Sequence, residues 1–212
     1  MKKITLSNRQ YNERSTIIAG EQGVLEGIFI KGLDESAVIA SPHPLFGGSM
    51  SNPVINEIAY SFYRLNYNSL RFNYRGVDGS QGEITDNIDK CLKDYNSTVK
   101  HLLETSKDNN YIGAGYSFGS YITYAYYLQN KNQSKMILVS PPNTMYDFQL
   151  SKISIPTLII YGSHDSYINS SIITEEAEKM PNIQTVIVNS DHFFSKNLNK
   201  ISLIINSWIK EK

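Results

Sequence analysis

Apolar residues recur along the chain with two different periods, which divide it into short strands and longer helices. Short β-branched runs predict strands, and apolar positions three and four residues apart predict helices. The predicted strands are Ile4–Ser7, Val24–Lys31, Ala37–Ser41, Ser69–Tyr74, Tyr111–Gly115, Met136–Ser140, Pro156–Tyr161 and Thr185–Val188. The predicted helices are Pro53–Leu65, Asp86–Leu103, Tyr121–Leu128, Glu175–Met180 and Leu198–Ile209. We expect the first two strands to form an antiparallel pair.

The alternation of strands and helices indicates the α/β class, with a mostly parallel central sheet and helices on both of its faces. No internal repeat or Pro/Gly-rich linker interrupts it, so we expect residues 1–212 to form a single domain. In such sheets, ligand sites form beyond the carboxyl ends of the strands. The loops that follow the strands are therefore the places where chemistry is expected.

Composition and charge narrow the classes of function. The formal net charge is +0 and the basic residues are scattered, so neither nucleic acid nor an anionic membrane is an expected partner. Cys91 is the single cysteine, which rules out an intrachain disulfide and favours a reducing compartment. No apolar segment resembles a signal peptide or approaches the roughly 18 residues of a membrane span. We expect a cytoplasmic protein.

The pentapeptide Gly115–Gly119 contains the candidate nucleophile, Ser117. It lies between a predicted buried strand and a predicted helix, and a turn this sharp needs glycines on both sides of the serine. The turn would expose the Ser117 hydroxyl above the sheet. It would also direct the Phe118 N–H, at a helix N-terminus, towards a developing oxyanion. A glycine-flanked turn without chemistry is the alternative.

A serine hydroxyl needs a neighbouring base, and the chain has four histidines. His101 falls within a helix, remote from any strand end, and is expected to be solvated. His43 and His164 follow strands, and His164 is more typical of polar surface. His192 follows the last strand and precedes the final helix, which makes it the best candidate for the base.

A carboxylate must orient the second ring nitrogen of that histidine. Asp165 occupies the loop after the preceding strand, which gives the chain order Ser117, Asp165, His192. Asp191 is the rival acid, although adjacent residues seldom point their side chains at each other. A solvated loop carboxylate is the expected state of Asp191.

Four motifs follow one another along the chain and suggest a family. They are His43–Gly48 (HPLFGG), Arg71–Gly76 (RFNYRG), Gly115–Gly119 (GYSFG) and Asp191–Phe194 (DHFF). Together they resemble the small, lid-poor bacterial α/β hydrolases related to dienelactone hydrolases and serine esterases. The resemblance covers about residues 41–194 and implies an α/β-hydrolase fold without a cap domain.

The resemblance also implies roles for individual residues. It implies that Ser117, Asp165 and His192 form a catalytic triad, and that the loop after the third strand completes the oxyanion hole. Pro44 has no N–H to donate, so Leu45 is the second expected donor and Phe46 the alternative. Two departures stand out: dienelactone hydrolases use a cysteine nucleophile, and the acid motif here fits only the Gly-x-x-Asp form.

Only about fifteen residues separate the strands that end at Ser140 and begin at Pro156, which is too short for a lid. We therefore expect an open, shallow site that accepts small acyl groups. The side chains expected to line it are His43, Phe46, Tyr116, Tyr146, Phe148 and Phe193. For each aromatic residue, packing in the core is the alternative.

The chemistry expected from these residues is hydrolysis of a small ester or thioester, with no metal or organic cofactor. A metal-dependent hydrolase is one alternative, with candidate ligands His43, His164, Asp165, Asp191 and His192, but no His-Glu-x-x-His spacing supports it. An inactive binding protein that has kept the fold is the other. The sequence leaves the natural substrate and the oligomeric state open.

Overall fold

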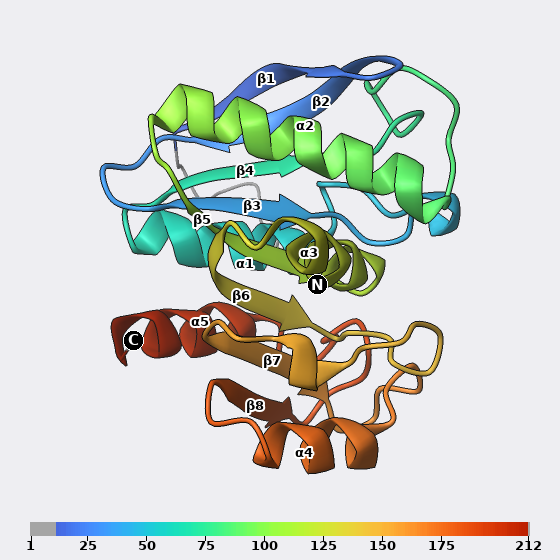
Figure 1. The fold of residues 1–212 in the computed structure, drawn as a ribbon, viewed down its shortest axis with the longest axis vertical. Helices are drawn as coiled ribbons and strands as arrows, with labels where there is room; N and C mark the ends of the chain where they lie inside the picture. Colours follow the sequence, from blue (N-terminus) through green and yellow to red (C-terminus); the bar gives the residue numbers. More distant parts are fainter. Residues whose placement is uncertain (1–11, 212) are drawn as a thin grey trace, which may run out of the picture.

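The computed structural model describes residues 12–211, which form one eight-stranded sheet with helices on both faces (Figure 1). The strands are β1 Glu13–Gly20, β2 Gly23–Ile30, β3 Ser36–Ala40, β4 Asn68–Phe72, β5 Tyr111–Tyr116, β6 Gln133–Val139, β7 Thr157–Gly162 and β8 Ile183–Val188. The α-helices are α1 Pro53–Arg64, α2 Ile88–Ser106, α3 Phe118–Asn130, α4 Ser170–Glu178 and α5 Asn199–Glu211. Two short 3-10 helices, η2 Pro44–Phe46 and η3 Leu150–Lys152, lie in loops.

The order of strands across the sheet is β1-β2-β4-β3-β5-β6-β7-β8. The strand β2 pairs antiparallel with both β1 and β4, and every pairing from β4 to β8 is parallel. The parallel strands therefore end at one edge of the sheet, where the loops after β3, β5, β7 and β8 meet. This is the α/β-hydrolase fold, as predicted.

Two helical layers bury the sheet. On one face, α1 and α5 pack against each other and over the central strands, with Ile55, Phe62 and Trp208 among the buried residues. On the other face lie α2, α3 and α4. The central strands β3, β5 and β7 are buried along their whole length, as expected for strands covered on both faces.

The opening pair of strands differs from the prediction. Within the described residues, β2 pairs with Glu13–Gly20 on one edge and with β4 on the other, and β1 was not among the predicted strands. Residues 4–7 themselves lie outside the described part of the chain. In β1 only Ile18 is buried, because this strand forms the edge of the sheet. A mostly exposed strand shows little apolar alternation, which is why its sequence gave no clear signal.

The connection from β6 to β7 spans residues 140–156 and contains only the short helix η3. Cap domains of this fold would enter between these strands, and this segment is too short to form one. No domain inserted between these strands therefore covers the edge of the sheet in the described residues.

Candidate active site

Ser117 occupies a sharp turn between β5 and α3. Its backbone has φ 54° and ψ −122°, a strained conformation for a residue with a side chain. The two flanking glycines make the turn possible: a Cβ at Gly115 would lie 2.2 Å from the Gly119 carbonyl oxygen. A Cβ at Gly119 would lie 2.2 Å from the carbonyl oxygen of Ala40 in β3. The sequence pattern Gly-x-Ser-x-Gly thus meets a steric requirement at both glycines.

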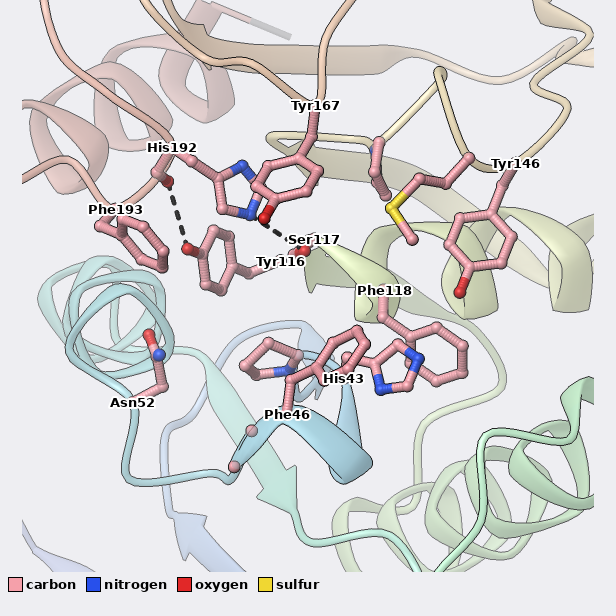
Figure 2. A pocket seen from close by; sticks show the side chains of 15 residues that line it. His43, Phe46, Asn52, Tyr116, Ser117, Phe118, Tyr146, Tyr167, His192 and Phe193 are labelled. Carbon is pink, nitrogen blue, oxygen red and sulfur yellow. Dashed lines mark hydrogen bonds between the residues drawn. The ribbon is translucent and has the colours of Figure 1, made fainter.

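The loops after β7 and β8 bring Asp165 and His192 to the serine, and Figure 2 shows His192 beside Ser117. His192 Nε2 lies 3.1 Å from Ser117 Oγ, and His192 Nδ1 lies 2.8 Å from Asp165 Oδ2. The other carboxylate oxygen, Asp165 Oδ1, accepts a hydrogen bond from the backbone N–H of Tyr167 at 3.0 Å. Asp165 and His192 are each 7% exposed. The three side chains form a continuous hydrogen-bonded chain whose carboxylate end is buried and whose serine end is partly exposed.

The rival groups are engaged elsewhere. The Asp191 carboxylate accepts hydrogen bonds from the backbone N–H and the hydroxyl of Ser195, and these bonds lower its pKa. His101 contacts Thr16 Oγ1 at 3.0 Å, and His164 contacts the hydroxyl of its neighbour Ser163. Among residues 12–211, no three His, Cys, Asp or Glu side chains converge in a way that could hold a metal ion.

Cys91 is buried in α2, and burial raises the pKa of its thiol to about 12. A thiol with that pKa stays protonated at neutral pH and is a poor nucleophile. The cysteine is also absent from the cavity that contains Ser117. It therefore belongs to the core rather than to the chemistry.

Three aromatic rings surround the imidazole of His192. The ring centroids of Tyr116, Tyr167 and Phe193 lie 5.3, 4.7 and 5.4 Å from that of His192. The Tyr116 hydroxyl also donates a hydrogen bond to the backbone carbonyl of His192 at 3.1 Å (Figure 2). Burial raises the pKa of Tyr116, with a further contribution from Asp165, so the phenol keeps its proton. The residue before the nucleophile is thereby bonded directly to the base loop.

The predicted oxyanion-hole donors are backbone N–H groups of Phe118 and of the loop after β3; Phe118 lines the cavity that contains Ser117, and Leu45 does not. Phe118 begins α3, so its N–H has no partner within the helix. In the loop after β3, Phe46 N–H already bonds the His43 carbonyl at 3.1 Å, whereas Leu45 N–H has no partner within residues 12–211. This difference favours Leu45 over Phe46 as the second donor.

Asn73, in the motif Arg71–Gly76, holds the far end of the loop that contains Leu45. Its side-chain oxygen accepts a hydrogen bond from the backbone N–H of Met50 at 2.7 Å, and its amide nitrogen lies 2.9 Å from Glu26 Oε2. Asn73 is fully buried. We infer that this motif braces the loop rather than contacting a substrate.

A cavity of about 230 Å³ opens above Ser117. Of the predicted pocket residues, five line it: His43, Phe46, Tyr116, Tyr146 and Phe193. The sixth, Phe148, does not, and this prediction is wrong. Phe148 turns the other way and packs on Tyr121 and Tyr124, with ring centroids 5.5 and 5.1 Å away.

Sequence reasoning missed several residues of the cavity wall, which are Pro42, Gly47, Gly48, Asn52, Pro142, Met145 and Tyr167. Tyr167 had an available signal, since it lies two residues beyond Asp165 in the same loop. None of the residues that line the cavity is an acid, a lysine or an arginine. The only titratable side chains on its wall are histidines and tyrosines, and the surface offered to a ligand is mainly apolar and aromatic.

Comparisons with known proteins identify the family. A model of the family described as serine aminopeptidase, S33, matches residues 46–147. An uncharacterized protein of Rickettsia prowazekii is 30% identical over 210 residues, which cover 90% of this chain and 86% of that protein. The chain belongs to the bacterial α/β hydrolases.

Solved structures place it among serine hydrolases of this family. An α-β serine hydrolase homologue from Coxiella burnetii is 26% identical, with a TM-score of 0.83 over 93% of this chain and 97% of that one. A candidate α/β hydrolase of unknown function from Agrobacterium tumefaciens is also 26% identical, with a TM-score of 0.85 over 93% of this chain and 95% of that one.

Within residues 12–211, no helix is long and apolar enough to cross a membrane.

Proposed function

We propose that this α/β hydrolase is a serine esterase that cleaves carboxylic esters or thioesters of small, uncharged acyl groups through an acyl-enzyme on Ser117. The observation that carries the proposal is the hydrogen-bonded chain from Ser117 through His192 to Asp165, at the base of a cavity with no lid. A serine in this setting is activated by its neighbours rather than by a cofactor.

The reaction follows from the positions of the donors and acceptors. His192 Nε2 accepts the Ser117 proton as Oγ attacks the substrate carbonyl carbon. Asp165 accepts the Nδ1–H bond, which orients the ring and stabilises the imidazolium that forms. The Phe118 and Leu45 N–H groups donate to the carbonyl oxygen as it becomes an oxyanion. The imidazolium then protonates the departing alkoxide or thiolate, and water releases the acid by the same steps.

The composition of the cavity wall favours an esterase over an aminopeptidase. An aminopeptidase must bind the charged α-ammonium group of its substrate, and a buried charge needs a partner of opposite sign. No carboxylate lines this cavity, since Asp165 lies behind His192 and is bonded to it. We therefore propose that uncharged acyl groups are preferred over aminoacyl groups, although the family model carries the name of an aminopeptidase.

A fluorophosphonate probe tests the nucleophile and the base together. We expect the wild type to be labelled, Ser117→Ala to remain unlabelled, and His192→Ala to be labelled much more slowly. Equal labelling of Ser117→Ala and wild type would refute the assignment. An unlabelled wild type that is correctly folded would instead indicate a binding protein that has kept the fold.

A substrate pair tests the class of reaction. Hydrolysis of p-nitrophenyl butyrate should exceed hydrolysis of an aminoacyl p-nitroanilide by a wide margin in kcat/KM. Activity should also survive treatment with EDTA. A preference for the anilide would favour aminopeptidase activity, and a loss in EDTA that Zn²⁺ restores would favour a metal-dependent hydrolase.

A further inference from the structure

A second cavity of about 140 Å³ lies beside the candidate active site and has no part in the proposed chemistry. Its wall consists of Leu138, Pro141, Asn143, Tyr146, Asp147, Phe148, Leu150, Ile159, Ile172, Ile173 and Glu176. Strands β6 and β7 contribute Leu138 and Ile159, and α4 contributes Ile172, Ile173 and Glu176. The cavity is mainly apolar, and its size is close to the roughly 150 Å³ that can hold a benzene-sized ligand.

The segment 141–148 separates the two cavities, and we call it the partition. Its residues alternate between the two sides: Pro142 and Met145 line the cavity above Ser117, whereas Pro141, Asn143 and Asp147 line the second one. Tyr146 lines both. The partition is therefore a single layer of chain, and Tyr146 is the point at which the two spaces adjoin.

Ring contacts hold Tyr146 in this position. Its ring stacks on Tyr121 of α3, with centroids 4.5 Å apart and an angle of 20° between the planes. It also meets the edge of Phe118, the residue that follows the nucleophile, at 5.9 Å. Figure 2 shows the Tyr146 ring at the side of the cavity, beside Phe118. Its hydroxyl has no hydrogen-bond partner within residues 12–211, so packing alone fixes the side chain.

We propose that Tyr146 determines acyl-chain length: its ring ends the acyl site, and the second cavity is the space that a longer acyl chain would enter if the ring were absent. The inference rests on the proposed esterase function and makes it more specific. The substrate class that follows is esters of short, uncharged carboxylic acids. Longer acyl chains would meet the ring.

A series of p-nitrophenyl esters from acetate to octanoate tests this, because the leaving group stays constant while the acyl chain grows. The wild type and Tyr146→Phe should share a preference for short chains, since both retain the ring. In Tyr146→Ala, kcat/KM for hexanoate or octanoate should rise by about tenfold relative to butyrate. The reason is that each extra methylene group of the acyl chain would contact the apolar wall of the second cavity. Tyr146→Leu should show a smaller shift in the same direction and serves if the alanine variant folds poorly.

A second substitution tests whether the gained space is the second cavity. Ile172 lines that cavity but is 49% exposed, so Ile172→Trp can fill it from the outside with little disturbance of the core. In the Tyr146→Ala background, Ile172→Trp should abolish the gain on long acyl chains. On its own it should leave short-chain activity unchanged, because Ile172 is absent from the cavity above Ser117.

Three results from the variants would overturn the inference: an unchanged chain-length profile in a folded Tyr146→Ala, a gain that persists with Ile172→Trp, or a gain that depends on the length of the alcohol instead of the acid when alkyl acetates are compared. A long-chain optimum in the wild type would do the same. Fluorophosphonate labelling separates this failure from that of the proposed function. Labelled variants without a shift would refute the role of Tyr146 alone, whereas an unlabelled wild type would refute the esterase itself.

Discussion

Two buried carboxylates in this molecule each pair with a nitrogen-containing side chain. The two pairs differ in which group lies beyond that side chain. Asp94 in α2 accepts bonds from Arg75 Nε, Nη2 and backbone N–H at 2.7–3.1 Å, and both residues are 1% exposed. Asp165 accepts one bond from the imidazole of His192, whose other nitrogen faces Ser117 and the open cavity. We call the first pair closed: Arg75 Nη2 also bonds the Lys90 carbonyl and lies 3.5 Å from Glu21, and none of these groups lines the cavity above Ser117. The second pair is open, because it ends at Ser117.

This difference separates a structural pair from a candidate catalytic one. The Arg75 guanidinium carries a permanent charge and cannot give up a proton, so its bonds to Asp94 only connect the segment after β4 to α2. An imidazole can lose and regain a proton near neutral pH, and that capacity is useful only where a reacting group is within reach. Burial of an acid therefore does not identify an active site; the group beyond its partner does.

The largest effect should come from breaking the open pair. Asp165→Asn removes the carboxylate that orients His192, and we expect kcat to fall about 10⁴-fold with little loss of stability. Asp191→Asn is the matched control, because the Asp191 carboxylate accepts hydrogen bonds from Ser195 in the neighbouring turn. Ester hydrolysis and urea unfolding should be measured on both variants. A larger loss in Asp191→Asn would transfer the orienting role to that residue.

Breaking the closed pair, Arg75 and Asp94, should lower stability and leave turnover nearly unchanged. Asp94→Asn leaves the Arg75 charge buried without a full partner, and we expect the free energy of unfolding to fall by about 3–5 kcal/mol. Turnover per folded molecule should change little, since neither residue lines the cavity. Urea titration together with active-site labelling distinguishes the two quantities. A stable but inactive Asp94→Asn would contradict the separation of roles.

Tyr116 offers a smaller and more selective test, because its hydroxyl bonds the carbonyl of the base residue. Tyr116→Phe removes that bond and keeps the ring, and we expect kcat to fall by between about twofold and tenfold, with KM unchanged. In a His192→Ala background the same substitution should have no further effect on the residual rate, because Tyr116 acts through the base.

Tyr161→Phe is the control for Tyr116→Phe. It removes the contact between the Tyr161 hydroxyl and Thr174 Oγ1, at 3.1 Å, which lies outside the cavity above Ser117. This variant should lower stability at most, without any change in kcat. If Tyr116→Phe lowered the rate of hydrolysis by the same factor in the wild type and in His192→Ala, the role of the Tyr116 hydroxyl would be structural.

The sequence predicted the candidate site best where a potential catalytic residue lies in the loop directly after a predicted strand. Ser117, Asp165 and His192 each lie in the loop after a parallel strand with a recognisable local pattern, so parallel strands that end at one edge were enough to predict that they meet. Phe148 was not predictable in this way, because the direction of a side chain in an irregular loop depends on the surface beneath it. The edge strand β1 was missed for a related reason: only Ile18 of its residues is buried.

The contact between His43 and Asp86 is intermediate between the two buried pairs and gives the finest test of the comparison. His43 Nε2 lies 3.8 Å from Asp86 Oδ2, and that carboxylate is exposed. The His43 ring stacks on Phe46, with centroids 4.3 Å apart, and lies 4.9 Å from Phe118. Burial lowers the pKa of His43, and the Asp86 charge opposes this effect only in part.

Because the pKa of His43 is lower in the folded state, the unfolded chain binds more protons as pH falls through its ordinary value of about 6.5. The stability associated with neutral His43 is therefore complete above that pH and is lost below it, as the pH approaches the folded-state pKa. In urea titrations between about pH 7.5 and 5.5, His43→Gln should lose less stability on acidification than the wild type, since glutamine does not titrate. Asp86→Asn should lose more, because the charge that favours the imidazolium is gone. If Asp86→Asn instead left the pH dependence unchanged, the carboxylate would not be acting on His43 at all, and this contact would belong with neither of the two pairs.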